Sequence, residues 1–174
     1  MKVASIVTTF ACSLLLTGTL LRPPIAQAAA SEEDKQFLSM AAQSDMNEIK
    51  LSELAQAKAS NPQVKAFAHK MVSDHNMLEA NMEPFATAWG LTAPAGLDSD
   101  HQAIYDKLNG LSGTDFDKAY MDAMAEDHHK ALDAFTEEGD TTQDAKFKAA
   151  VLKGKTIVAA HTKMADSLKS KLSV

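Results

Sequence analysis

The sequence predicts an all-α protein: an up-and-down four-helix bundle with a short extra crossover helix. Three observations lead to this prediction. The 174-residue chain has few aromatic residues (6%) and only seven glycines, whereas residues that favour helices are abundant. Signals that start and stop helices recur along it, and apolar residues recur at helical spacing. The length suits one domain that can bury its own core.

Composition excludes several classes of protein. The formal net charge is −6, from 17 Lys and Arg against 23 Asp and Glu, which argues against a nucleic-acid binder. A single cysteine, Cys12, excludes an internal disulfide framework and a thiolate metal cluster. The chain has no Walker loop, dinucleotide-binding fingerprint or nucleophile elbow. No reaction can be chosen on these grounds, and whether the protein is an enzyme stays open.

Residues 1–28 are predicted to be a secretory signal peptide. Lys2 gives a positive start, residues 3–21 form an apolar run, and Ala26-Gln27-Ala28 has the small-x-small pattern of a cleavage site. Because the apolar run approaches the ~20 residues of a membrane span, a retained anchor is the alternative. Cleavage after Ala28 would place the remaining chain in the periplasm or outside a bacterium.

The predicted mature chain, residues 29–174, is more acidic than the whole sequence. Cleavage removes Lys2, Arg22 and Cys12, so the formal net charge becomes −8 and no thiol remains. No later apolar run is long enough to span a membrane. We therefore expect a single exported domain whose ligands, if it has any, are not thiolates.

The first two long helices have clear boundaries. Ser31 followed by acidic residues caps a helix that runs to about Ala59. Asn61, with proline at the next position, starts a second helix that Gly90 ends. Pro84 lies inside the second helix and should kink it or end it early.

The three later helices are predicted from pairs of capping residues. The expected elements are a short helix starting at Ser99 with Gln102 and reaching about Leu111, a long helix starting at Thr114 with Asp117 and ending near Gly139, and a last helix starting at Thr141 with Asp144 and reaching Leu172.

Each long helix carries an apolar seam, a stripe of residues spaced alternately by four and three, as in left-handed bundles. The four seams should face one another in one core. Four polar residues interrupt them, one in each helix: Glu48, His75, His128 and His161. Burying such groups without partners costs several kcal/mol, so they must contact one another, water or a metal ion.

One glutamate and three histidines are a suitable ligand set for a divalent transition metal such as zinc, iron or copper. Asp74 and Asp127, each immediately before a seam histidine, are predicted to accept hydrogen bonds from the imidazoles or to serve as alternative ligands. Counted from Asp140, His161 lies several residues farther along its helix than His128, which predicts an offset of about 10 Å. His161 could therefore lie outside the site.

Several short motifs resemble those of a known family. Residues 71–75 and 124–128 share the pattern Met-x-x-Asp-His, and they accompany Phe37-Leu38, the run Glu48–Ala55 and the late His161. In these features the chain resembles an exported bacterial ferritin-like family, domain of unknown function 4142. The resemblance covers nearly all of residues 29–174 and implies a ferritin-like helical bundle in the cell envelope. The family's biochemical role is largely uncharacterised.

Three functions remain open from the sequence. The Glu and His residues favour an exported bundle that binds a divalent transition metal in its core. Alternatively, the protein is a non-enzymatic structural or stress-related envelope protein whose polar core residues only fix helix packing. A bundle that binds haem or another small molecule is the third hypothesis. The oligomeric state stays open.

Overall fold

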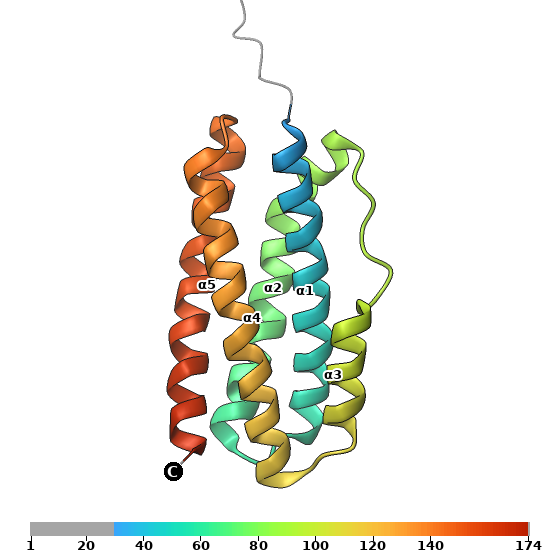
Figure 1. Ribbon diagram of the computed structural model, residues 1–174, viewed down its shortest axis with the longest axis vertical. Coiled ribbons are helices and arrows are strands. Elements are labelled where there is room, and N and C mark those ends of the chain that lie inside the picture. Colours follow the sequence, from blue (N-terminus) through green and yellow to red (C-terminus); the bar gives the residue numbers. More distant parts are fainter. Residues whose placement is uncertain (1–29, 174) are drawn as a thin grey trace, which may run out of the picture.

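The computed structural model describes residues 30–173, so the predicted signal peptide lies outside the described residues. Within that range the chain forms five helices and no strand: α1 (Glu32–Lys58), α2 (Pro62–Trp89), α3 (Ser99–Asn109), α4 (Gly113–Thr141) and α5 (Ala145–Leu172). The four long helices form a bundle, and the short α3 lies beside its lower end (Figure 1). The predicted all-α four-helix bundle with an extra crossover helix is confirmed.

Two antiparallel hairpins make up the bundle. The most extensive helix packing is between α1 and α2 and between α4 and α5, and the hairpins meet through contacts of α1 with α4 and of α2 with α5. The segment after α2 runs down the length of the bundle to α3 before α4 begins (Figure 1). Because of this crossover, each long helix is antiparallel to both helices that it packs against.

The boundaries of α1 and α2 follow the predicted signals. Ser31 caps α1 in a reciprocal pair with Asp34, and Asn61 caps α2. Gly90 ends α2 at a positive φ of 70°, which glycine adopts at little cost. Pro84 does not end α2 early, since the helix continues to Trp89. Its exposed position lets water hydrate the carbonyl that loses its partner.

The predicted caps of the other three helices are each displaced. Asp98, rather than Ser99, caps α3 by accepting a hydrogen bond from the backbone N–H of His101. Asp144 is the N-cap of α5, because α4 continues to Thr141. The N-cap of α4 is Ser112, which makes no capping hydrogen bond through its side chain.

Asp117 caps a turn of another hairpin instead of its own helix. Its carboxylate is buried and accepts hydrogen bonds from the backbone N–H groups of Ser60, at 3.0 Å, and Asn61, at 2.8 Å, and from the Ser60 hydroxyl. The two N–H groups belong to the turn between α1 and α2. Asp117 thus joins the start of α4 to that turn and fixes the lower ends of the two hairpins relative to each other.

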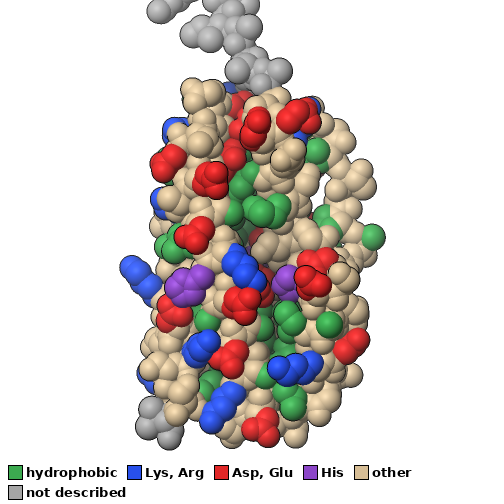
Figure 2. Space-filling view, viewed as in Figure 1, with side chains coloured by type: hydrophobic (Ala, Val, Ile, Leu, Met, Phe, Trp, Pro, Cys, Tyr) green, Lys and Arg blue, Asp and Glu red, His purple; other side chains and the backbone are tan. Residues whose placement is uncertain are grey.

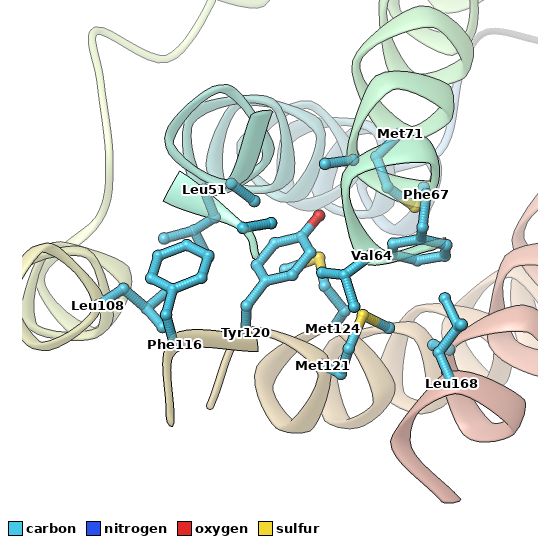
Figure 3. Close-up of a cluster of buried hydrophobic side chains, with 14 of the residues drawn as sticks. Leu51, Val64, Phe67, Met71, Leu108, Phe116, Tyr120, Met121, Met124 and Leu168 are labelled. Atoms are coloured by element: carbon cyan, nitrogen blue, oxygen red, sulfur yellow. The ribbon is translucent and has the colours of Figure 1, made fainter. Parts of the chain in front are cut away.

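Two apolar clusters fill the bundle, one at each end. The lower cluster surrounds Tyr120 and takes side chains from all five helices (Figure 3). The upper cluster contains Phe37, Phe135 and Phe147, whose rings pack edge to face with centroids 5.0 Å and 6.0 Å from Phe37. The four polar seam residues lie between the two clusters along each helix. Among the described residues, no helix combines the length and apolar character of a membrane span.

Replacing Asp117 with alanine should destabilise the fold. The substitution leaves two backbone N–H groups of the α1–α2 turn without their buried acceptor, at an expected cost of about 2–4 kcal/mol in the free energy of unfolding. Urea unfolding measures this. Asp115→Ala is the matched control, because Asp115 is exposed in the same turn of α4 and should change stability by no more than about 0.5 kcal/mol. Equal effects of the two substitutions would contradict this role of Asp117.

Candidate metal centre

Glu48, His75, His128 and His161 form one polar layer in the middle of the bundle. We call them the Glu/His cluster; α1, α2, α4 and α5 each contribute one member. The four residues are 1%, 2%, 0% and 0% exposed, respectively. The imidazole rings lie close together, with centroids 5.7 Å apart for His75 and His128 and 5.4 Å for each pair that includes His161.

His161 therefore lies in the same layer as the other three, and the predicted offset of about 10 Å is not observed. The physical reason is the position of the turn between α4 and α5. His128 lies thirteen residues before the end of α4 at Thr141, and His161 lies sixteen residues after the start of α5 at Ala145. Three residues correspond to ~4.5 Å along a helix, which long side chains can bridge.

His75 lies between two carboxylates. Its Nδ1 is 2.7 Å from an oxygen of Asp45 and forms a hydrogen bond with it. Its Nε2 is 2.8 Å from an oxygen of Glu48, but this contact lacks hydrogen-bond geometry. Because a carboxyl group lies close to each ring nitrogen, the site must hold either a cation or a second proton, on the ring or on Asp45, whose pKa is raised by burial. Burial lowers the pKa of His75, but the charges of Glu48 and Asp45 and the hydrogen bond with Asp45 outweigh it and raise the pKa to about 10.

His128 has a fixed tautomer. Its Nδ1 lies 2.8 Å from the backbone carbonyl oxygen of Met124, which can only accept, so Nδ1 carries the proton and donates. Its Nε2 is buried and has no hydrogen-bond partner. In the neutral ring this second nitrogen is an acceptor with a free lone pair.

His161 has the opposite tautomer for the same reason. Its Nε2 is 2.8 Å from the carboxylate of Asp74, to which it donates, and its Nδ1 is buried without a partner. Burial lowers the pKa of His161 to about 4 although the Asp74 hydrogen bond opposes it, so the ring is neutral near pH 7. Asp74 also pairs with Lys70 at 2.8 Å. Burial raises the pKa of Asp74, but the hydrogen bonds from Lys70 and His161 outweigh it and lower this pKa.

The cluster therefore gathers three buried ring nitrogens and a carboxylate oxygen that have no hydrogen-bond partner. One ring nitrogen from each of the three histidines lies within 4.8 Å of the other two, and Asp45, Glu48 and His75 form a second such group. Burial raises the pKa of Glu48, but His75 and His128 outweigh it and lower the pKa to about 2, so the group is a carboxylate. Three imidazole nitrogens and a carboxylate oxygen can bind a divalent transition metal at about 2.0–2.2 Å.

The two aspartates singled out in the sequence have different positions. Asp74 accepts a hydrogen bond from His161 rather than from its neighbour in sequence, His75. Asp127 contacts none of the four members of the Glu/His cluster through a hydrogen bond or ion pair that the structure shows. Instead, its carboxylate lies 3.4 Å from Nε2 of His101 on α3, beside a cavity of about 320 Å³. The two aspartates differ because Asp74 lies against α5, whereas Asp127 lies against α3.

Sequence reasoning missed two groups that hold the imidazoles. Asp45 lies one turn before Glu48, and the Asp45-x-x-Glu48 spacing places both carboxylates on one helix face, which could have been recognised as a paired ligand or acceptor motif. The Met124 carbonyl could not be recognised, because a backbone group inside a helix has no signature in sequence.

Solved structures share this fold. The chain superimposes on a DUF305 fragment from Deinococcus radiodurans with a TM-score of 0.72 and 13% identity, covering 82% of this chain and 98% of that one. A DUF305 protein from Streptomyces coelicolor gives 0.71 and 14%, covering 84% and 96%. The protein CopM in its Cu(II)-bound form gives 0.68 and 19%, covering 79% and 96%. At these identities the likeness shows the fold alone.

No curated protein sequence matches the chain significantly. A family model, the domain of unknown function DUF4142, matches residues 20–168 and so spans all of α1 to α4 and most of α5. The match includes every member of the Glu/His cluster as well as Asp45 and Asp74. The chain belongs to the DUF4142 family.

Proposed function

We propose that this protein holds a divalent transition-metal ion in the core of its helical bundle. His75, His128, His161 and Glu48 are the proposed ligands. The observation that supports this best is the convergence of three buried imidazole nitrogens that have no hydrogen-bond partner. Unpaired polar groups of this kind are costly in a protein interior, and a bound cation would satisfy all of them together.

The partners of the imidazoles support the same proposal. Metal-binding histidines usually donate their other N–H to a carboxylate or a backbone carbonyl, which fixes the ring and its tautomer. Each histidine here has such an acceptor: Asp45 for His75, the Met124 carbonyl for His128, and Asp74 for His161. These acceptors leave the opposite nitrogen of each ring buried and without a hydrogen-bond partner.

The chemistry of the ligands suits zinc, iron and copper. Imidazole and carboxylate suit all three in their divalent states, and the described residues contain no cysteine. Copper is the first metal to test, because CopM shares the fold and is described in a Cu(II)-bound form.

The closed site favours binding over catalysis. No member of the Glu/His cluster is more than 2% exposed, whereas a catalytic metal needs an open position for substrate. We infer a role in storing, buffering or sensing metal in the cell envelope. The pattern of residues 1–28 supports export, and one structural neighbour is described as a candidate secreted protein.

A structural role for the cluster is the second candidate function. It is favoured by the contacts of His75, which lies between Asp45 at 2.7 Å and Glu48 at 2.8 Å. A doubly protonated ring would satisfy both carboxylates without a metal and would fix the relative positions of α1 and α2. In that case the protein would act in the envelope through its surface.

Metal analysis of the untagged protein separates the two functions. We expect about one copper, zinc or iron ion per chain after loading and gel filtration, and loss of that ion when His75→Ala and His128→Ala are combined, since two of four ligands are gone. The matched control combines His69→Ala with His129→Ala, which removes two exposed histidines and should leave the stoichiometry unchanged. Far below one ion per chain for all three metals in the wild type would exclude the metal function.

Asp74→Asn tests the hydrogen bond that Asp74 accepts from His161. Losing the carboxylate that orients His161 should weaken metal affinity about 10- to 100-fold, measured by competition with a chromophoric chelator. Asp127→Asn is the control, because Asp127 also precedes a cluster histidine but contacts His101 instead. A purely structural cluster predicts that Asp74→Asn alters the free energy of unfolding and that neither variant changes metal affinity.

A further inference from the structure

A second group of buried oxygen atoms lies at the upper end of the bundle, where α1 begins and α4 ends (Figure 1). A cavity of about 710 Å³ opens there. Five carboxylates line it and no Lys, Arg or His does: Glu33, Asp34, Glu137, Glu138 and Asp144. Acidic side chains are also frequent around the upper end of the face drawn in Figure 2. The lining therefore carries a concentrated negative charge.

Glu138 is the residue that this arrangement leaves unsatisfied. It is only 6% exposed, and its Oε1 is buried without a hydrogen-bond partner. The hydroxyl oxygen of Thr142, one helical turn further on and 5% exposed, makes no hydrogen bond of good geometry but lies close enough to Asp34 to lower the pKa of that carboxyl group. Burial, together with the adjacent carboxyl of Asp34, raises the pKa of Glu138 to about 7. Two carboxyl groups in such contact must share either a proton or a cation.

The other carboxylates near this point already have partners. Asp34 accepts a hydrogen bond from the backbone N–H of Ser31, and Asp144 accepts from the backbone N–H groups of Lys146 and Phe147 at the start of α5. Among the described residues, no backbone N–H group donates a hydrogen bond to the carboxyl group of Glu138. Glu138 lies in the last turn of α4, where the helix dipole and the free carbonyl groups favour a cation.

We propose that Glu138, Asp34 and the Thr142 hydroxyl bind a calcium ion at the upper end of the bundle. Calcium accepts six to eight oxygen ligands at about 2.3–2.6 Å in irregular geometry, and water in the open cavity would complete its shell. These protein ligands are all oxygen atoms, in contrast to the nitrogen-rich Glu/His cluster, so the two sites select different classes of metal. The ion would link the start of α1 to the end of α4. This proposal does not depend on the metal function of the core.

Thermal unfolding of the exported, chelator-treated protein at about pH 8 tests the site. Calcium at about 5 mM, above the Kd of extracellular calcium modules, should raise Tm by about 5 °C. Glu138→Gln should abolish that response. The same substitution should raise the Tm of the calcium-free protein, because it removes a buried negative charge beside Asp34. No response to calcium in the wild type would overturn the proposal and leave a carboxyl pair that shares a proton.

Glu137→Gln is the matched control, because it removes the same charge from the neighbouring exposed position on the cavity rim. It should lower calcium affinity by no more than about three-fold, against at least ten-fold for Glu138→Gln, measured by calorimetry. Equal losses would mean that calcium is attracted only by the general negative charge, and the site would be rejected.

Two further experiments test the calcium site, one by changing the pH and the other by removing histidines of the Glu/His cluster. Calcium affinity should fall several-fold from pH 8 to pH 6, because a proton competes with the ion for Glu138, which lines the cavity together with Glu33, Asp34, Glu137 and Asp144. Protein carrying both His75→Ala and His128→Ala should keep its response to calcium. If that variant does not fold, zinc-saturated wild-type protein should show the same response. Loss of the response in either would place calcium in the core and contradict the proposal.

Discussion

The buried carboxylate of Glu48 is the constraint on which the rest of the structure depends. An ionised group that is 1% exposed is tolerated only with positive charge or hydrogen-bond donors close to it. The neighbours of Glu48 are the rings of His75 at 2.8 Å and His128 at 3.4 Å. Each comes from a different helix, so the charge can be satisfied only when the helices stand in one particular register. The polar layer thereby specifies how two apolar clusters, which alone would tolerate sliding, are stacked along the bundle.

That register is set by the helix ends as much as by the core. Asp117 reaches from α4 to the turn between α1 and α2, and the length of α4 places its turn so that His161 stands level with the layer. The acceptors behind the rings, Asp45 and Asp74 among them, then decide which nitrogen of each imidazole faces inward. The metal site that we propose is prepared in this way, so it would need little reorganisation on binding an ion. Full burial of that proposed site would make release slow unless the helices separate, which suits storage or sensing better than turnover.

The fold and the members of the Glu/His cluster could be predicted from the sequence because both depend on periodicity. Steps of four and three put Glu48 and the three histidines on the inner face of four helices, whatever the details of the turns. Properties that depend on single hydrogen bonds could not be predicted. The capping pattern places Asp117 at the start of its own helix, although its carboxylate accepts hydrogen bonds from a turn 57 residues away in sequence. The level of His161 depends on where α4 ends. The roles of Asp74 and Asp127 differ because one faces α5 and the other faces α3, and spacing along one helix does not contain that information.

X-ray absorption spectroscopy of the untagged protein, loaded with copper or zinc and freed of excess metal, tests the central claim most directly. The account predicts a bound ion whose inner shell is mainly imidazole nitrogen at about 2.0 Å, with the outer-ring scattering that identifies histidine and an oxygen ligand from Glu48. A shell made only of oxygen, a shell dominated by sulfur, or a protein that retains no metal would contradict a metal centre in the bundle core.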